Sequence, residues 1–253
     1  MPAPIALQLY SLRETFAGGR FADVIRQVAD IGYVGVETFG GVPTAEAAPL
    51  FRELGLEVVA AHSDLPLGDK KNAVLDNMAA LNCKRLVCPW MPPEEFQSQD
   101  SIRRVCDKLN EADEVARANG LTLFYHNHWF EYQLTDGRYP YKSLVDCLNP
   151  TVFFELDTYW VKTGGPDPAD VIRQFGPRAP LLHIKDGPAD SKDKPMVAVG
   201  DGVMDWEAIV KASENTAEWM IVELDRCATD MLEAVRKSYA YLTEKGYARG
   251  RKS

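Results

Sequence analysis

The sequence contains FFELD at residues 153–157, LLHIKD at 181–186 and IVELD at 221–225, three short apolar runs that each stop abruptly at ionisable side chains. Each run has the length and composition of a β-strand that is buried on both faces. The metal-binding residue types that they carry are Asp157, His183 and Glu223. Because the carboxyl ends of neighbouring parallel strands meet at one edge, two carboxylates and an imidazole gathered there favour a site for a divalent metal.

A fourth run, upstream of these three, ends in two histidines. It reads LTLFYHNH at residues 121–128, so His126 offers a fourth ligand to the same site. Residues i and i+2 share one face of a strand, which places His126 and His128 on the same side. A single residue of this kind is ordinarily a capping or salt-bridging group, but four consecutive strand ends of the same kind favour a functional site.

Segments with strand-like and helix-like periodicity alternate along the whole chain. The expected strands cover residues 5–10, 33–38, 57–62, 85–88, 121–126, 152–156, 181–185 and 219–224. The expected helices cover residues 20–31, 44–54, 70–81, 101–119, 141–148, 168–175, 205–213 and 230–245. Eight such units in 253 residues predict a single (β/α)8 barrel domain spanning residues 1–253. The absence of G-x-G-x-x-G and of G-x-x-x-x-G-K-[ST] argues against a dinucleotide-binding fold and a P-loop fold.

Composition and charge restrict the partners and the compartment. The formal net charge of −9 argues against binding to nucleic acid or to an anionic membrane through bulk electrostatics. No apolar run approaches the roughly 20 residues that a membrane span needs, and no signal-peptide pattern opens the chain. The five cysteines include no C-x-x-C pair and are expected to be free thiols, with Cys106 and Cys147 as core filler. These features predict a cytoplasmic protein.

Two earlier strands and three loops offer contacts to a substrate. Glu37 and His62 end the strands at 33–38 and 57–62, where each could bind a substrate hydroxyl or simply hydrogen-bond a loop. Tryptophans follow three of the strands and could form an apolar wall against a sugar face, with loop packing as the alternative. They are Trp90, Trp129 and Trp160.

The loop after the strand at 181–185 contains VGDGVMDW at residues 199–206. Its glycines permit tight turns, and Asp205 is suited to cap the following helix. A phosphate-binding cradle is the weaker interpretation of the same glycines. Arg226 could hold an anionic substrate group, although a surface ion pair is the simpler role.

These motifs resemble those of the xylose isomerase-like (β/α)8 barrel family, the sugar phosphate isomerases/epimerases, over nearly the whole chain. The residues that carry the resemblance are Tyr125–His128, Glu155–Val161, His183–Asp186, Gly200–Gly202 with Asp205–Trp206, and Val222–Glu223. The resemblance implies one divalent ion, Mn²⁺ first and Mg²⁺, Co²⁺ or Zn²⁺ as alternatives. By position its ligands are His126, Asp157, His183 and Glu223. Members of the family often associate as homo-oligomers.

One position departs from the family's ketose epimerases. Those enzymes have a glutamate at the strand-5 position, which pairs with the strand-8 glutamate as the second acid/base. This chain has His126 at that position and Glu223 at the other. Glu131, in the loop that follows, is a candidate to replace the missing carboxylate.

The chemistry that the resemblance implies is removal of a proton from the carbon next to a carbonyl. Isomerisation, epimerisation and dehydration of sugars share this step, and a metal ion can stabilise the resulting enediolate. We predict Glu223 or His128 as the base. Lys185 would lie near the oxyanion or the substrate, with an ion pair to Asp186 or Glu223 as its alternative role.

The leading hypothesis is therefore a metal-dependent isomerase or epimerase of a small carbohydrate. Its rival on the same site is a lyase that eliminates water or an alcohol from a keto-sugar, which the strand-5 histidines favour. A barrel that binds a sugar without turnover is a third hypothesis. An endonuclease of the related abasic-site family is disfavoured, because its three-zinc site needs more than the 4 histidines present.

Overall fold

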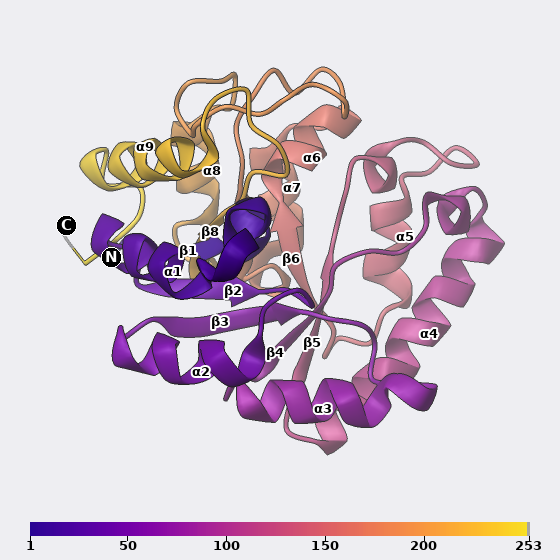
Figure 1. Cartoon of the computed structure of the whole chain (residues 1–253). Coiled ribbons are helices and arrows are strands. Elements are labelled where there is room, and N and C mark those ends of the chain that lie inside the picture. The colour runs from indigo at the N-terminus through magenta and orange to yellow at the C-terminus, as the bar shows by residue number, and fades with distance from the viewer. Residues whose placement is uncertain (252–253) are drawn as a thin grey trace.

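The computed structural model describes residues 1–251, in which parallel strands close into a barrel in the order β1 to β8 (Figure 1). The strands are β1 Ile5–Gln8, β2 Gly35–Thr38, β3 Glu57–His62, β4 Arg85–Cys88, β5 Thr122–His126, β6 Phe153–Asp157, β7 Leu181–Ile184 and β8 Trp219–Val222. Each strand pairs with the next one, and β8 closes the ring on β1 through Ala6 and Ile221. The predicted (β/α)8 barrel is confirmed.

The helices connect the strands and lie outside the barrel (Figure 1). The α-helices are α1 Phe21–Ile31, α2 Thr44–Glu53, α3 Lys71–Ala80, α4 Gln99–Ala118, α5 Pro140–Cys147, α6 Thr158–Gly164, α7 Pro168–Phe175, α8 Trp206–Ser213 and α9 Met231–Glu244. The 3₁₀ segments are η1 Leu9–Gly19, η2 Gly68–Lys70, η3 Pro93–Phe96, η4 Phe130–Tyr132 and η5 Gly176–Arg178.

Several strands and helices begin or end where side chains cap the backbone. The first strand stops at Gln8 rather than at residue 10, because the Gln8 side chain accepts a hydrogen bond from the Tyr10 backbone N–H at 3.0 Å and starts η1. Asp157 starts the unexpected helix α6 by accepting from the Trp160 backbone N–H at 2.8 Å. Asp205 caps α8 as predicted, with its carboxylate 3.0 Å from the Ala208 backbone nitrogen.

The inside of the barrel changes from apolar to polar along the strands. Its amino-terminal part is filled by a small apolar cluster, distinct from the main core around the helices: Ala6, Val59, Ala60, Val87, Phe124, Leu181, Trp219 and Ile221. Four polar residues follow members of this cluster by two positions in the sequence: Gln8, His126, His183 and Glu223. Since side chains alternate along a strand, the strands that pack the bottom of the barrel also deliver polar groups to its carboxyl end.

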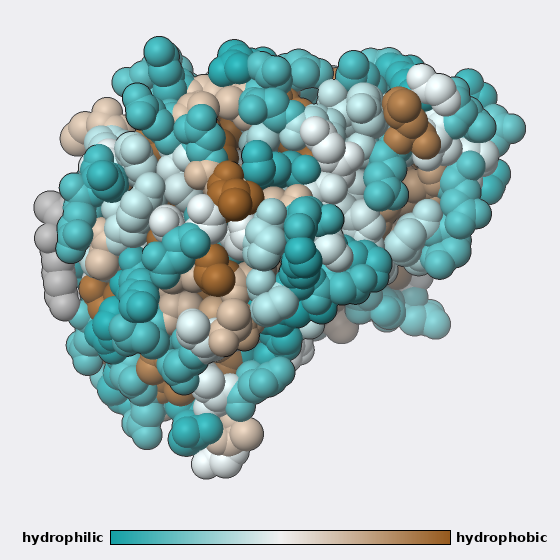
Figure 2. All heavy atoms as spheres, turned by 90° about the horizontal axis from the view of Figure 1, so that it is seen from above, coloured by the Kyte–Doolittle hydropathy of each residue, from teal (hydrophilic) through white to brown (hydrophobic). Residues whose placement is uncertain are grey.

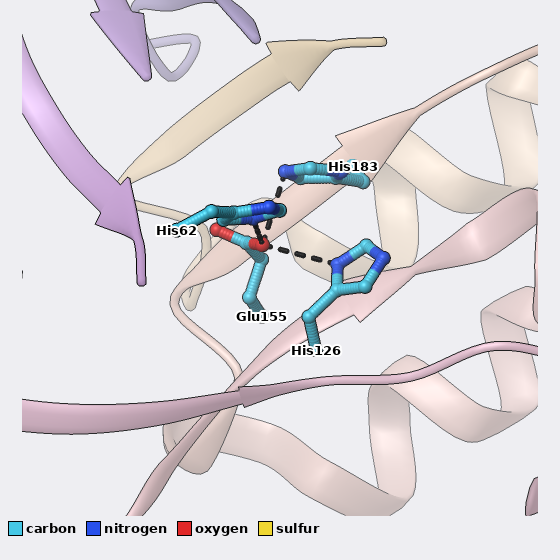
Figure 3. A group of neighbouring side chains, drawn as sticks. All are labelled: His62, His126, Glu155 and His183. Atoms are coloured by element: carbon cyan, nitrogen blue, oxygen red, sulfur yellow. Dashed lines mark hydrogen bonds and ion pairs between the residues drawn. The ribbon is translucent and has the colours of Figure 1, made fainter. Parts of the chain in front are cut away.

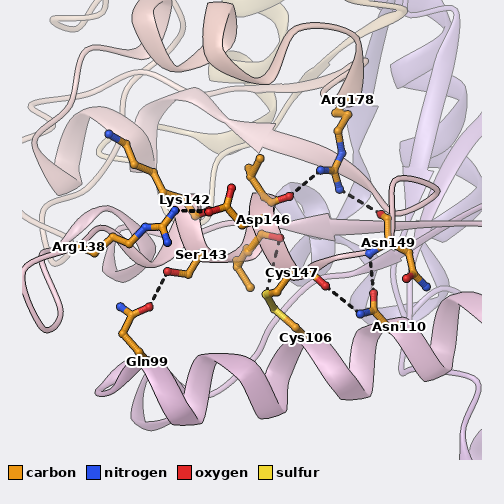
Figure 4. The surroundings of a disulfide bond; sticks show 12 residues. Gln99, Cys106, Asn110, Arg138, Lys142, Ser143, Asp146, Cys147, Asn149 and Arg178 are labelled. Atoms are coloured by element: carbon orange, nitrogen blue, oxygen red, sulfur yellow. Dashed lines mark hydrogen bonds and ion pairs between the residues drawn. A yellow bond between two sulfur atoms is a disulfide. The ribbon is translucent and has the colours of Figure 1, made fainter.

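A disulfide between Cys106 and Cys147 joins α4 to α5, 41 residues apart in sequence (Figure 4). The prediction that all cysteines are free thiols is therefore wrong for this pair, while Cys83, Cys88 and Cys227 are free. The two cysteines face each other because α4 and α5 pack side by side. The Asn110 side chain of α4 donates to the Cys147 carbonyl at 3.0 Å across the same contact. Cysteine usage thus no longer supports a reducing compartment.

The outer surface shown in Figure 2 is mainly hydrophilic, with hydrophobic residues in small separate spots. None of the helices formed by residues 1–251 has both the length and the apolarity needed to cross a membrane.

Candidate functional site

A cavity of about 780 Å³ opens over the carboxyl ends of the barrel strands. This volume lies within the range of about 300–1,000 Å³ that small-molecule sites occupy. The predicted site residues in its wall are His62, Trp90, His126, His128, Trp160 and Glu223. The cavity therefore stands where active sites of this barrel architecture are found.

Four buried side chains from consecutive strands meet next to the cavity, and two of them, His126 and Glu223, line it. They are His126 on β5, Asp157 on β6, His183 on β7 and Glu223 just after β8. One ligand atom from each lies within 4.8 Å of the ligand atoms of the others. We call these four residues the mouth set. The structure thus brings together all the residues that the sequence predicted as metal ligands.

The two carboxylate oxygens of Asp157 have different roles: one caps helix α6, and the other points into the mouth set. Its Oδ1 accepts the hydrogen bond from the Trp160 backbone that starts α6. Its Oδ2 has no hydrogen bond, lies 3.8 Å from His126 Nε2 and forms an ion pair with Lys185 Nζ at 2.9 Å. The Asn127 side-chain oxygen accepts from the Asp157 backbone N–H at 2.9 Å, which fixes the strand end.

Lys185 is fully buried and lies against the carboxylates of the mouth set. Its ammonium is 2.9 Å from Asp157 Oδ2, 2.6 Å from Glu223 Oε2 and 2.8 Å from Asp225 Oδ2. Burial opposes the charge, but the three carboxylates outweigh it and hold the pKa of Lys185 well above its ordinary value. Lys185 is therefore a cation that shares its carboxylates with the mouth set.

The predicted alternative pairing of Lys185 with Asp186 is not formed, because Asp186 holds the loop after β7 instead. Its Oδ2 accepts from the Gly200 backbone N–H at 2.9 Å and from Trp206 Nε1 at 2.8 Å. Its Oδ1 accepts from the Met204 backbone N–H at 3.2 Å. With the Gly200 amide occupied by a carboxylate, the structure does not support the phosphate-cradle interpretation of this loop.

A second cluster shares two imidazoles with the first (Figure 3). Its members, which we call the inner set, are His62, His126, Glu155 and His183. Glu155 Oε2 is 2.7 Å from His62 Nε2 and 3.0 Å from His126 Nδ1. The same oxygen is 3.1 Å from His183 Nε2. Three imidazoles therefore converge on one carboxylate oxygen.

The spacing of ligand atoms differs in part between the two sets. Ligand atoms around a tetrahedral ion bound at about 2.0–2.2 Å lie roughly 3.3–3.6 Å apart. In the inner set the nitrogens stand 2.7–3.1 Å from the shared oxygen, which is hydrogen-bond spacing. In the mouth set Asp157 Oδ2 and His126 Nε2 are 3.8 Å apart, although His183 Nδ1 and Glu223 Oε2 are only 2.9 Å apart.

The donor types of the mouth set also match a divalent ion. Two imidazoles and two carboxylates suit Mn²⁺, Co²⁺ or Zn²⁺, and Asp157 Oδ2 is a buried oxygen without a hydrogen bond. The mouth set therefore fits an ion better than the inner set does. An ion bound there would share Asp157 and Glu223 with the Lys185 ammonium.

The carboxylates of both sets act on the imidazoles. Burial lowers the pKa of His62, but Glu37 and Glu155 overcome it and raise the pKa to about 10. Burial and the neighbouring His183 lower the pKa of His126, so this imidazole is neutral. Burial also opposes a charge on His183, yet its carboxylate neighbours hold its pKa well above the ordinary value. Metal binding at His183 must therefore release a proton.

His128 stands in the cavity wall with a free nitrogen. Its Nδ1 is buried and has no hydrogen bond, and the ring contacts Trp90 edge-on with the centroids 4.5 Å apart. Burial and the Lys185 charge lower the pKa of His128, so the imidazole is neutral. A neutral imidazole with an unused nitrogen beside a cavity can accept a proton from a bound molecule.

Glu131 does not take the place of the strand-5 glutamate. Its carboxylate is fully buried among other partners, accepting from the Tyr125 hydroxyl at 2.6 Å and from the His128 backbone N–H at 2.9 Å. Burial raises the pKa of Glu131 to about 7. Glu131 belongs to neither metal-competent cluster within residues 1–251.

The residues predicted to bind substrate fall into two groups. Trp90 is 44% exposed at the cavity mouth, Trp160 is 4% exposed, and both line the cavity together with His62 and Trp129. Glu37 is fully buried and bonded to His183 and the Gln8 side chain, so the structure corrects its predicted role as a substrate contact.

Three residues that shape the site were not assigned a role from the sequence. Glu155 shares a strand face with Asp157, and Asp225 shares one with Glu223, so the i, i+2 rule was the signal that could have placed both in the site. Gln8 carries no such signal, because a lone glutamine at the end of a short strand is common. Its contact with Glu37 at 2.7 Å follows from the pairing of β1 with β2, which sets Gln8 opposite Glu37.

Comparison with known proteins agrees with this geometry. The family description "Xylose isomerase-like TIM barrel" matches residues 25–245. Among curated proteins, an inosose dehydratase from Clostridium beijerinckii is 26% identical over 170 residues. That match covers 59% of this chain and 56% of the relative, so only part of the relative's length is matched.

Solved structures extend the likeness over the whole barrel. A sugar phosphate isomerase/epimerase from Parabacteroides distasonis superposes with a TM-score of 0.83 at 25% identity, covering 98% of this chain and 100% of that one. The IolI protein, whose structure contains a bound zinc atom, superposes with a TM-score of 0.71 at 15% identity, covering 97% and 99%. At this low identity the second likeness concerns the fold alone.

Proposed function

The chain belongs to the xylose isomerase-like TIM barrel family, and we propose that it is a divalent-metal-dependent enzyme that removes the proton next to the carbonyl of a carbohydrate or polyol ketone. One observation carries the proposal: the mouth set offers four ligand atoms within 4.8 Å of one another, and two of its members, His126 and Glu223, line a cavity of about 780 Å³. His128 lines the same cavity, and its buried Nδ1 has no hydrogen bond.

The mouth set, His126, Asp157, His183 and Glu223, would hold the ion. A bound divalent ion would act as a Lewis acid on the substrate oxygens and stabilise the enediolate. Mn²⁺ is the first candidate, and the zinc atom bound by the IolI protein makes Zn²⁺ the second. Because His183 must lose a proton to bind an ion, we expect metal affinity to rise with pH.

We assign the base to His128 rather than to Glu223. Glu223 Oε2 is already engaged by Lys185 at 2.6 Å and by His183 Nδ1 at 2.9 Å, and its pKa is lowered by these cations against the effect of burial. His128 is neutral and has an unused nitrogen. Lys185 would donate to the developing oxyanion, and the unpaired Trp160 Nε1 could donate to a substrate hydroxyl.

Elimination is the outcome that we favour after proton removal. Epimerisation by two bases requires an available base on each face of the reacting carbon, and Glu223 is occupied by its cations. The name inosose dehydratase of the curated relatives supports the same choice. Suitable substrates are cyclic polyol ketones such as an inosose, and keto-sugars.

Isomerisation or epimerisation is the second candidate. The sugar phosphate isomerase/epimerase from Parabacteroides distasonis has 25% identity to this chain and covers nearly all of it. Both outcomes begin with the same proton transfer, so they differ in product rather than in the residues that start the reaction.

The test is exchange of the substrate proton with solvent. The protein, loaded with Mn²⁺, Co²⁺ or Zn²⁺, is incubated in D2O with inosose, keto-sugars and aldoses, and NMR follows deuterium at the carbon next to the carbonyl. Ultraviolet absorbance of a conjugated enone reports elimination. Chelator-treated protein is the control.

The outcomes separate the hypotheses. Deuterium uptake with enone formation supports a lyase, and uptake with a new sugar epimer or isomer supports the second candidate. Sugar binding without exchange under all three metals would contradict an enzyme and support a non-catalytic sugar-binding barrel.

A further inference from the structure

We propose that the buried carboxylates Glu37 and Glu155 are positioning residues that orient the two imidazoles of the mouth set, His183 and His126. This inference rests on the proposed function, because it requires an ion at the mouth set. It concerns residues that do not touch the ion or the substrate. It gives the inner set a role distinct from a second metal site.

Each shared imidazole spans the two sets with opposite nitrogens. His183 places Nδ1 2.9 Å from Glu223 in the mouth set, and Nε2 3.1 Å from Glu155 in the inner set and 2.7 Å from Glu37, which belongs to neither set. His126 places Nε2 toward Asp157 at 3.8 Å and Nδ1 3.0 Å from Glu155. Both rings therefore present one nitrogen to the mouth set and the other to a buried carboxylate.

This arrangement determines which nitrogen is free to bind an ion. A neutral imidazole has one N–H donor and one lone pair. Once His183 has released the Nδ1 proton to make room for an ion, its Nε2–H still donates to Glu37, and the Nδ1 lone pair faces the mouth set. When the N–H of Nδ1 of His126 donates to Glu155, the lone pair stands on Nε2. Carboxylates in this position fix the tautomer and the ring orientation of metal-binding histidines.

The Glu37 carboxylate is itself held in place. Gln8 lies opposite Glu37 in the β1–β2 pairing, and its side-chain nitrogen donates to Glu37 Oε2 at 2.7 Å. The Gln8 side-chain oxygen is used as well, since it accepts from the Tyr10 backbone N–H at 3.0 Å. Glu37 and Gln8 are both fully buried, so solvent does not compete for these contacts. Because the Glu37 carboxylate is held in place, it also holds the His183 ring that donates a hydrogen bond to it.

The rival explanation of the same cluster is a second ion in the inner set. The distances of 2.7, 3.0 and 3.1 Å from Glu155 Oε2 to three nitrogens favour hydrogen bonds over ligands of a common ion. The two explanations predict different metal contents, one ion per chain against two.

The experiment is a titration of the metal-free full chain with Co²⁺, followed by calorimetry and by the visible absorption of bound Co²⁺. The variants are Glu37→Leu, which cannot accept a hydrogen bond, and Glu37→Gln, which still can. Gln8→Leu tests the support of Glu37 without altering either set. The control is Glu57→Leu, which removes a largely exposed glutamate from the amino-terminal end of β3.

We expect one Co²⁺ per wild-type chain and about 10–100-fold weaker binding in Glu37→Leu. Glu37→Gln should recover part of this loss, because its amide oxygen replaces the acceptor. Gln8→Leu should lose less than Glu37→Leu, and the control should bind as wild type. The absorption of bound Co²⁺ should shift in Glu37→Leu at saturation, because the His183 ring is no longer held. A role limited to fold stability would leave this spectrum unchanged.

Two results would overturn the inference alone: wild-type affinity and spectrum in Glu37→Leu, or two Co²⁺ ions per wild-type chain. A wild-type chain that binds no Co²⁺ would overturn the proposed function and the inference with it. If Glu37→Leu does not fold, Glu37→Gln and Gln8→Leu decide the question, since wild-type binding in both contradicts the positioning role.

Discussion

The two ends of the barrel interior differ sharply although the same strands build them. At the amino-terminal end, Phe124, Leu181 and Ile221 pack in a small apolar cluster. Two residues further along the same strands, His126, His183 and Glu223 form a buried cluster of charges and hydrogen bonds. Burying such groups costs stability unless each finds a partner.

The comparison shows that the two ends of the strands have different roles. The amino-terminal ends contribute mainly to the stability of the barrel, and the carboxyl ends carry the residues for chemistry. The apolar end stabilises the barrel by removing hydrophobic surface from water. The polar end holds carboxylates, imidazoles and Lys185 in contacts of 2.6–3.1 Å, which position groups for chemistry. Substitutions at the two ends should therefore change different measured quantities.

The largest effect is expected from Asp157→Ala at the polar end. Loss of this ligand should abolish stoichiometric Mn²⁺ or Co²⁺ binding and lower the exchange rate by about 10³-fold or more, since a catalytic ion contributes several kcal/mol. Elemental analysis and NMR exchange measure the two quantities. Asp157→Asn is the matched variant, because it can still cap α6. Full metal content in Asp157→Ala would contradict the assignment of the mouth set.

His128→Gln should separate catalysis from metal binding within the polar end. Removing a general base lowers the rate by about 10²–10⁴-fold. The Co²⁺ affinity should stay at the wild-type value, because His128 belongs to neither cluster. Kinetics of deuterium uptake and Co²⁺ titration provide the two readings. Undiminished exchange would move the base to another residue, with Glu223 the next candidate.

Phe124→Ala tests the opposite end of the same strand. It should lower the free energy of unfolding by about 3–5 kcal/mol, because the aromatic ring leaves a cavity in a packed cluster. Urea denaturation measures this change. The Co²⁺ affinity of the folded variant should be unchanged, and a large loss of affinity would show that the two ends are not separable.

Glu131 provides a second comparison, between two buried carboxylates. Glu223 has cations next to it, and Glu131 has none among residues 1–251. Burial raises the pKa of Glu131 from 4.5 to about 7, so the folded state holds its proton more tightly than the unfolded state. Its contribution to stability is present below pH 4.5 and is lost as the pH rises through about 7, by about 3 kcal/mol in all.

Glu131→Gln should remove this part of the pH dependence. Urea unfolding of both proteins at pH 5 and pH 8 isolates the contribution, since other titrating groups are common to them. The wild type should lose more stability than the variant between the two values. Parallel losses in the two proteins would contradict the raised pKa.

Strand-end patterns in the sequence are enough to predict most of the mouth set. Asp157, His183 and Glu223 end apolar runs, and only inward-facing strand positions in an alternating βα chain explain that placement. The helix cap at Asp205 is equally local, because it depends on a side chain and a backbone group three residues away.

Other predictions failed where the partner lies far away in the chain or in an unexpected contact. Glu37 resembles a substrate contact in sequence because its partner His183 is 146 residues away. Cys106 and Cys147 resemble free thiols because they lie 41 residues apart. Glu131 is a candidate for the second acid/base carboxylate by its position in the loop, but its partners Tyr125 and His128 use both of its oxygens.

The sequence by itself determined the alternation of strands and helices, the apolar bottom of the barrel and the residue types at its mouth, because each depends on periodicity or on neighbours within one turn. Only the tertiary structure decided which nitrogen of His126 and His183 faces which carboxylate. For His126 the choice depends on the register of β5 against β6, and for His183 it depends on the closed barrel, which brings Glu37 of β2 to the ring. Hydrogen bonds across a barrel are set by distances between strands, which no local pattern contains.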